Sequence, residues 1–296
     1  MIAIIKLYKM KKLRLFILFA VYSSISIAQK TDKSLEKKIN ELISTFNGEI
    51  GIYVKDLQKN NIVSINADTI FPTASIVKIP ILIGIMNKIH NKELDYHQKL
   101  TWFDTLNYDP GEDIVAYLKP ETKIELSKVM MLMMTISDNT GSLWLQHIAG
   151  TGITINRLMD QLGYSKTRVN SRTPGRESDR SVYGWGQTSP AEMARIVEDI
   201  VNGKIISPEA CDKMLRIMGR QYWDEEGLSS IPPNVYVASK NGAVNASRSE
   251  VMYVKGPHPY IFSIFTKNNK DTGWEHDNEA WVLTRKLSKI IWDHFN

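Results

Sequence analysis

Apolar and polar positions repeat along this chain with two different periods, and each change of period marks a boundary between elements. Between residues 34 and 46, apolar side chains recur three or four positions apart, which predicts an amphipathic helix. Residues 49–56 and 62–66 alternate with a period of two instead. Because a polar stretch at 58–61 joins these two runs, they predict a β-hairpin.

Helical spacing dominates the middle of the chain, from about residue 73 to residue 202, and strand patterns return only after it. The predicted helices cover residues 76–89, 126–135, 141–148, 155–162 and 191–201. Three strand patterns follow at 234–239, 249–254 and 260–266, separated by Gly and Pro turns. A last amphipathic helix is expected at about 279–295.

This order of elements predicts an α/β fold of the α+β kind. Strands on both sides of a helical block indicate one antiparallel five-stranded sheet, assembled from both chain ends and flanked by helices. The sheet lobe would take about residues 30–72 and 205–296, and an all-helical second lobe about 73–204. A cleft between two such lobes is the natural place for a binding site.

The first 28 residues have the pattern of a secretory signal. A positively charged start precedes an apolar run at 15–22, and residues 26–28 offer a small-x-small cleavage site. The apolar run is shorter than the roughly 20 residues that span a bilayer. We therefore expect a cleaved signal at 1–28, no stable membrane anchor, a single domain at 29–296, and export across an inner membrane to the periplasm.

Charge and residue usage exclude several classes of partner. Residues 1–28 carry five Lys or Arg and no acid, so 37 − 5 = 32 basic residues face 32 acidic ones in the remainder. A near-neutral chain gives no electrostatic basis for a nucleic-acid partner. The single cysteine, Cys211, is expected to be a small buried helix residue. The six histidines lack zinc-ligand spacing, so we expect no metal or cofactor, and nothing demands more than a monomer.

The first candidate for chemistry is Ser75 with Lys78, at the start of an apolar helix. Side chains three apart share one helix face, so the amine can reach the hydroxyl and, when neutral, take its proton. Free backbone N–H groups at the helix start would also stabilise a developing oxyanion. The same spacing at Ser34 and Lys37 belongs to a solvated helix face, so the spacing needs support from elsewhere in the chain.

Two further motifs supply that support. Ser137-Asp138-Asn139 separates two predicted helices, where such residues commonly cap a helix but would also place a hydroxyl and a carboxamide at a cleft mouth. Lys240-Asn241-Gly242-Ala243 ends a predicted strand. It reads either as an ordinary turn with a surface lysine or as a cation facing the serine, with the Ala243 N–H as an oxyanion donor.

Taken in order, the three motifs resemble those of the class A β-lactamase and penicillin-binding-protein superfamily, whose signature is S-x-x-K, S-D-N and K-T-G. The second and third motifs follow Ser75 by 62 (137 − 75) and 165 (240 − 75) residues. The flanks Pro110-Gly to Lys119-Pro and Gln187 to Ala194 extend the resemblance over essentially the whole mature chain.

The resemblance implies a role for each matching residue. Ser75 would be acylated, with Lys78 as its base and the Lys240 charge lowering the proton affinity of Lys78. Ser137 would pass the proton to the leaving nitrogen. Asn139 would bind the substrate amide side chain.

At the strand motif, the resemblance implies that Lys240 orients Ser137 and attracts the substrate carboxylate. The backbone N–H groups of Ser75 and Ala243 would form the oxyanion hole. Arg248 is a further candidate anchor for the substrate carboxylate.

Two positions depart from the family pattern. Class A enzymes carry a water-activating glutamate where this chain has Thr173, and the family's Asn four residues later is Glu177 here. Either Glu177 acts as a relocated base, or water activation is poor and the acyl-enzyme is long-lived. Glu177 can also be interpreted as a solvated surface charge. Asn241 replaces a hydroxyl residue that meets the substrate carboxylate, although its amide can still donate a hydrogen bond.

The resemblance thus implies a serine hydrolase acting on a small-molecule β-lactam or related amide. Two alternatives stay open: a D-alanyl peptidase or amidase on cell-wall peptides, and a catalytically slow sensor that binds β-lactams or cell-wall peptides.

Overall fold

The computed structural model describes residues 29–103 and 113–296. The predicted signal at 1–28 and the Pro110-Gly part of the family resemblance lie outside the described residues. Residues Thr31–Asn296 form one unit.

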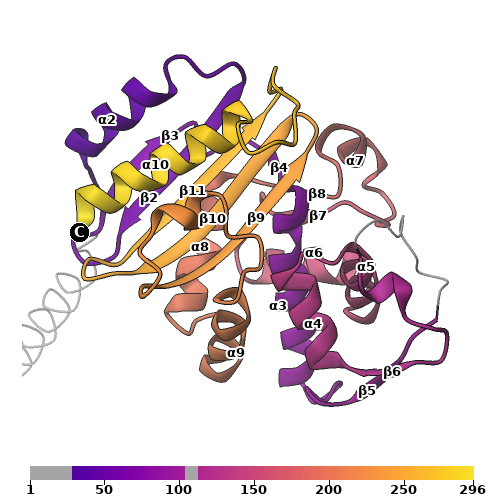
Figure 1. Ribbon diagram of the computed structural model, residues 1–296. Helices are drawn as coiled ribbons and strands as arrows, with labels where there is room; N and C mark the ends of the chain where they lie inside the picture. Colours follow the sequence, from indigo (N-terminus) through magenta and orange to yellow (C-terminus); the bar gives the residue numbers. More distant parts are fainter. Residues whose placement is uncertain (1–28, 104–112) are drawn as a thin grey trace, which may run out of the picture. The chain divides into compact units, whose positions relative to one another are not determined.

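The main sheet is antiparallel and is built from both ends of the chain, as the hydrophobic pattern predicts (Figure 1). Its order is β1-β3-β2-β11-β10-β9, so the N-terminal hairpin joins the C-terminal strands through β2 and β11. Ile52 faces Ile264 across that junction. The five predicted strands are present, with the two-residue β1 added at the edge. The strands are β1 (Lys30–Thr31), β2 (Glu49–Asp56), β3 (Asn61–Ile65), β9 (Tyr236–Val244), β10 (Ser247–Lys255) and β11 (Tyr260–Lys267).

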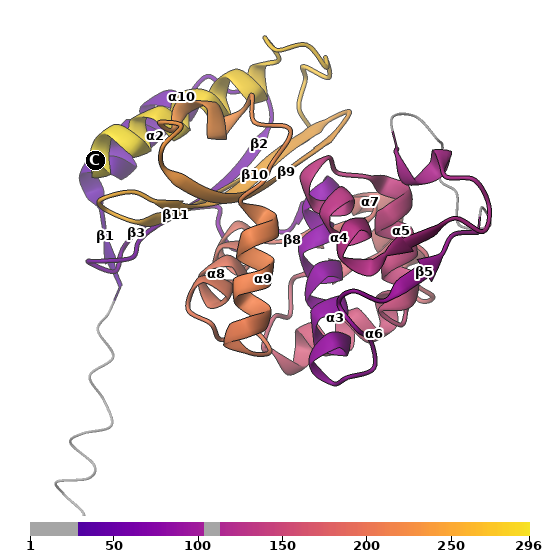
Figure 2. The same ribbon diagram turned by 60° about the horizontal axis from the view of Figure 1, so that its bottom comes forward.

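One face of the sheet is covered by the first and last helices, α2 (Lys33–Ile43) and α10 (Glu279–Phe295) (Figures 1 and 2). Leu35 of α2 and Leu287 of α10 are fully buried in the same cluster as strand residues such as Ile52 and Phe262. Each helix has an apolar stripe at helical spacing, and packing against this face of the sheet removes that stripe from water.

The opposite face carries α8 (Pro190–Val201) and α9 (Pro208–Met218) (Figure 2). Cys211 is buried in α9, as expected for a small helix residue. The core on this side is centred on α3 (Lys78–His90), which is buried along its first nine residues. A helix that is apolar all round must be enclosed, and α3 contacts α4 (Leu126–Thr135), α5 (Asn139–Ile148), α6 (Thr151–Gln161) and α9.

The block between the two halves of the sheet also contains short elements that the hydrophobic pattern does not predict. The predicted helix at 76–89 begins as a 3-10 turn, η1 (Ala74–Val77), before α3. Short strands form a small three-stranded sheet, β4-β8-β7, and a β5-β6 pair. The remaining elements are β4 (Phe71–Pro72), β5 (Lys99–Thr101), η3 (Val115–Tyr117), β6 (Lys123–Glu125), β7 (Arg168–Val169), α7 (Glu177–Tyr183), β8 (Gly186–Thr188) and η4 (Gly227–Ser230).

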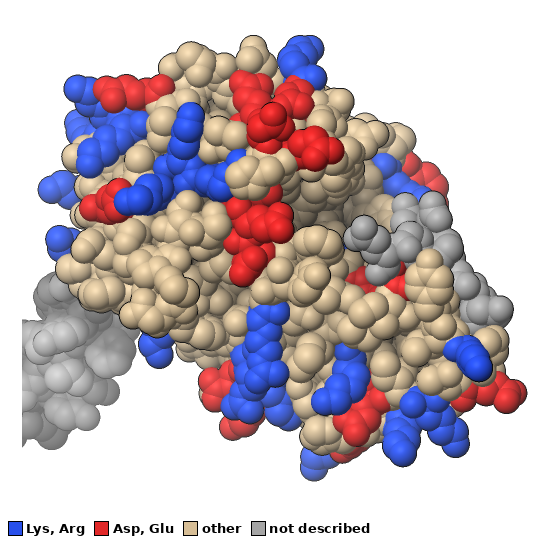
Figure 3. Space-filling model, viewed as in Figure 1, with Lys and Arg blue, Asp and Glu red and all other residues tan. Residues whose placement is uncertain are grey.

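Figure 3 shows both basic and acidic side chains on one face of the molecule, with acidic side chains gathered near its upper centre and basic ones toward its upper left. This distribution is consistent with the near-neutral charge count outside residues 1–28.

Candidate active site

Ser75 lies in η1, immediately before α3 begins, and is half-buried. The preceding residue, Ala74, has a φ of 43°, in the left-handed region that residues other than glycine rarely adopt. Such strain persists only where surrounding structure holds it, and it is common beside reactive residues. Thr73 is fixed next to it, since its N–H donates to the carbonyl of Gly186 at 2.9 Å.

The Lys78 amine joins two of the three sequence motifs. Its Nζ lies 3.0 Å from Ser75 Oγ, 2.9 Å from Ser137 Oγ, 2.6 Å from the Ser137 carbonyl and 2.8 Å from Asn139 Oδ1. An ammonium has three protons for these four oxygens. In the neutral amine, the two N–H groups can donate to the Ser137 carbonyl and to Asn139 Oδ1, which leaves the lone pair for one of the two serine hydroxyls.

The surroundings of Lys78 favour that neutral form. Its side chain is fully buried, and this burial, together with the charge of Lys240, lowers the pKa of Lys78 well below its usual value. The carboxylates of Asp113 and Asp138 act in the opposite direction. A lysine with a lowered pKa can serve as a general base toward a neighbouring hydroxyl such as that of Ser75.

The Ser-Asp-Asn motif divides its capping and site functions among its residues. Asp138 is the N-cap of α5, where its carboxylate accepts the N–H of Gly141 at 2.7 Å and that of Val115 at 2.9 Å. Ser137 has a φ of 64°, and this turn directs both Ser137 and Asn139 onto the Lys78 amine. Asp138 therefore caps the helix, whereas Ser137 and Asn139 contact the Lys78 amine.

Lys240 is fully buried on β9, and its Nζ donates to the Asn241 carbonyl at 2.9 Å and to Asn241 Oδ1 at 3.2 Å. Burial lowers the pKa of Lys240 to about 7, against the opposing charge of Glu250. Asn241, at the position of the family hydroxyl, therefore accepts hydrogen bonds from Lys240, and the bonds of Lys240 go to Asn241 rather than to Ser137.

Strand β9 reaches the nucleophile through Gly242. A Cβ at this position would stand 2.6 Å from the Thr73 carbonyl oxygen and 2.9 Å from the Ser75 nitrogen. Only glycine permits so close an approach between two backbones. This contact brings the third motif to the serine and sets Ala243 beside it, as a residue that lines the same cavities.

Two cavities meet at Ser75. The larger, about 910 Å³, is bounded by Ser137, Asn139, Asn241 and a wall of aromatic side chains that includes Trp223 and Trp274. The smaller, about 540 Å³, extends from Ser75 and Asn139 past Tyr183 and Ala243. Both volumes lie within the range of small-molecule sites.

Arg248 is fully buried, and its guanidinium is engaged by main-chain carbonyls. It also lies over the rings of Trp274 at 4.6 Å and Trp281 at 5.9 Å. Its carbonyl partners are those of Val244, Asn245, Ser247 and Gly273. Arg248 is not among the described residues that line either cavity at Ser75, so the structure gives it a structural role, and its use as a carboxylate anchor stays a prediction.

The two candidate positions for a water-activating group, Thr173 and Glu177, do not line the cavities at Ser75. Glu177 is exposed at the first position of α7, and its carboxylate accepts the Gly175 N–H at 3.1 Å. Thr173 is buried, donates to the Ser171 carbonyl at 2.9 Å and packs on Gly152, where a Cβ would stand 1.8 Å from its hydroxyl oxygen. Neither residue is among those lining the two cavities.

The carboxylates among the described lining residues are Asp113, Glu225 and Glu226, and the sequence patterns single out none of them. Glu226 is buried, which raises its pKa to about 7 even though the Arg285 guanidinium pairs with it at 2.6 Å. No local motif marks these acids, because the turns that carry them have no periodic pattern.

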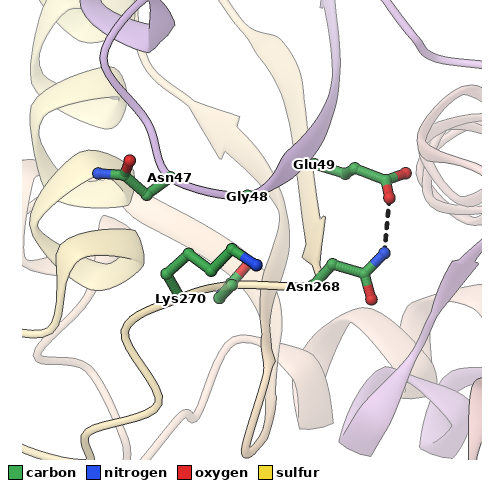
Figure 4. A pocket seen from close by; sticks show the side chains of 6 residues that line it. Asn47, Gly48, Glu49, Asn268 and Lys270 are labelled. Carbon is green, nitrogen blue, oxygen red and sulfur yellow. Dashed lines mark hydrogen bonds between the residues drawn. The ribbon is translucent and has the colours of Figure 1, made fainter.

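A further hollow lies where the loop before β2 meets the loop after β11 (Figure 4). Its rim is polar, and Asn268 donates to Glu49 across it at 2.5 Å. It shares only Asn268 with the smaller cavity at Ser75. It contains no combination of residues resembling the arrangement around Lys78.

Within residues 29–103 and 113–296, no group of three or more His, Cys, Asp or Glu side chains could hold a metal ion. In the same part of the chain, no helix combines the length and apolar character that a membrane span requires.

Comparison with known proteins finds a matching family model and several similar proteins. The family model described as the Beta-lactamase enzyme family matches residues 34–295. Beta-lactamase VEB-1 of Pseudomonas aeruginosa is 21% identical over 97% of this chain and 99% of its own length. The imipenem-hydrolyzing beta-lactamase of Enterobacter cloacae is 24% identical, over 94% and 97% of the two chains.

Solved structures share the fold. A beta-lactamase from Chitinophaga pinensis superposes with a TM-score of 0.81 at 19% identity, over 89% of this chain and all of that one. A mutant of PBP-A, solved as an acyl-enzyme complex with penicillin G, has a TM-score of 0.80 at 24% identity, over 90% and 98% of the two chains.

Proposed function

Because this chain belongs to the β-lactamase enzyme family, we propose that it opens a β-lactam or related amide through an ester on Ser75. The observation that carries the proposal is the buried Lys78 amine, which lies within 3.0 Å of both Ser75 Oγ and Ser137 Oγ. Serine β-lactamase-type hydrolysis is the activity of the family; the covalent step and the residue roles are the proposal.

In the acylation step, Ser75 Oγ attacks the amide carbonyl carbon while neutral Lys78 takes the hydroxyl proton. The carbonyl oxygen becomes an oxyanion, stabilised by the N–H groups of Ser75 and Ala243. When the C–N bond breaks, Ser137 gives its proton to the leaving nitrogen and regains one from Lys78. The products are the Ser75 ester, a neutral Lys78 amine and a protonated leaving nitrogen, so one proton has moved from Ser75 to that nitrogen.

The second step, hydrolysis of the ester, is where this chain departs from its family. Thr173 stands at the position of the expected glutamate and turns to the Ser171 carbonyl, while Glu177 is exposed. With no carboxylate from that loop lining the cavities at Ser75, we propose that deacylation is slow. This supports, as a second candidate, a peptidase or sensor that keeps its acyl group.

Intact-mass spectrometry after addition of benzylpenicillin distinguishes these functions. We expect an adduct of one penicillin on the wild-type chain and none on Ser75→Ala. An adduct that disappears with release of hydrolysed penicillin indicates a β-lactamase, and a persistent one indicates the peptidase or sensor. An undiminished adduct on Ser75→Ala would refute the assignment of the nucleophile.

We also propose that the chain is exported to the periplasm, supported by the charged and apolar pattern of residues 1–28. N-terminal sequencing of the protein recovered from the periplasm should begin at Gln29. Recovery of the uncleaved chain in the cytoplasm contradicts this.

A further inference from the structure

Asp113 is a buried carboxylate that lines the larger cavity and does not belong to any of the three motifs. Its Oδ1 accepts the Asn139 N–H at 2.9 Å. Its Oδ2 accepts both the N–H and the hydroxyl of Thr140, at 2.8 Å and 2.9 Å. It therefore binds the first turn of α5, at the residue whose side chain reaches the Lys78 amine.

The contact is reciprocal. While Asp113 reaches forward to Asn139 and Thr140, the Asp138 carboxylate reaches back to the N–H of Val115, two residues after Asp113. Two buried carboxylates thus hold together two segments that are separated along the chain by β6 and α4. A charged acceptor for a backbone N–H is both stronger and more directional than a neutral one.

The charges around Lys78 give the Asp113 carboxylate a second effect. Lys78 contacts Ser75 on η1, Ser137 in the turn before α5 and Asn139 at the first position of α5. The charged groups acting on it are Lys240 on β9 and the two carboxylates. Burial and Lys240 lower the pKa of Lys78, and Asp113 and Asp138 raise it. Asp113 is the one of these two acids that also holds the backbone of Asn139.

We propose that Asp113 is a positioning residue of this site: it holds the first turn of α5, and with it Asn139, against the Lys78 amine, and its carboxylate charge acts on that amine. The inference rests on the proposed acylation of Ser75. It goes beyond it by assigning a role to a residue outside the sequence motifs.

The test is the pH profile of acylation for Asp113→Asn, measured as the second-order rate of adduct formation with a chromogenic cephalosporin. The amide places a donor against one of the N–H groups of α5, so the rate should fall by roughly 10- to 100-fold. Loss of the carboxylate charge disfavours the ammonium form of Lys78. The acid limb of the profile should therefore move to lower pH, by on the order of 0.5 to 1 unit.

Three variants separate charge from shape. Asp113→Glu keeps the charge but not the geometry, so its rate should fall with the limb near its wild-type position. Thr140→Val removes only the hydroxyl bond and should also leave the limb in place. Asp56→Asn is the matched control, because Asp56 is another buried carboxylate that accepts two backbone N–H groups, those of Gln58 and Lys59, at the β2–β3 turn.

An Asp113→Asn profile that coincides with the wild-type limb, or moves to higher pH, overturns the inference while wild-type acylation still supports the proposed function. If the wild-type chain forms no adduct, the proposed function fails. The charge effect of Asp113 is then tested by an NMR titration of isotope-labelled Lys78. The midpoint should be lower in Asp113→Asn than in the wild type, and an unchanged midpoint refutes the charge effect.

Discussion

Gly242→Ala tests the contact on which the whole site depends, the approach of β9 to the start of η1. The added Cβ would stand 2.6 Å from the Thr73 carbonyl oxygen and 2.9 Å from the Ser75 nitrogen. Both obstacles are backbone atoms, so no side-chain rotation can relieve them. To restore ordinary contact at 3.4 Å, β9 must retreat from η1 by about 0.8 Å.

This retreat acts on both proposed oxyanion donors, because the Ala243 N–H moves with β9 and the Ser75 N–H lies at the point of collision. Loss of one such donor typically lowers a rate by about 10² to 10³. Overpacking a close contact costs about 1–3 kcal/mol of folding free energy. We therefore expect acylation to fall by at least 100-fold, with a moderate loss of stability.

The assay is the rate of adduct formation with benzylpenicillin, read together with urea unfolding. Gly84→Ala, within helix α3, is the control. A Cβ there meets side-chain atoms only, those of Ile155 at 3.1 Å and Ala149 at 3.3 Å. It should acylate normally, as alanine favours a helix. Wild-type rates and stability in Gly242→Ala would refute the close approach.

Three further predictions follow from single residues. Lys78→Met should lower acylation by about 10² to 10⁴, because it removes the base while filling the same buried space; a wild-type rate of adduct formation would exclude Lys78 as the base. Arg248→Lys should cost about 2–3 kcal/mol in urea unfolding, since a lysine cannot reproduce the bonds to several carbonyls or the stacking on Trp274; an unchanged midpoint contradicts this. Burial raises the pKa of Glu226 from 4.5 to about 7 against the pull of Arg285, so the folded chain keeps a proton that the unfolded chain releases. Wild-type stability relative to Glu226→Gln should therefore be highest below pH 4.5 and fall as pH rises to about 7; a difference that does not change with pH would show that Glu226 ionises normally.

The sequence by itself determined the elements and their order. The period of apolar side chains depends on a residue and its near neighbours, so the helices α2, α8 and α10 and the strands of the main sheet are legible without a structure. The three motifs could be proposed as one site because their order and spacing resemble a known family, and the Lys78 contacts now join Ser75 to Ser137 and Asn139.

Only the tertiary structure decided which side chains face the cleft. Arg248 and Glu177 are candidates by sequence, but packing encloses the first among carbonyls and leaves the second in solvent. Asp113 has no local signal, since its partners lie 26 and 27 residues further along the chain. Side-chain direction and long-range proximity result from how whole elements pack, and a linear pattern carries no information on distances between remote segments.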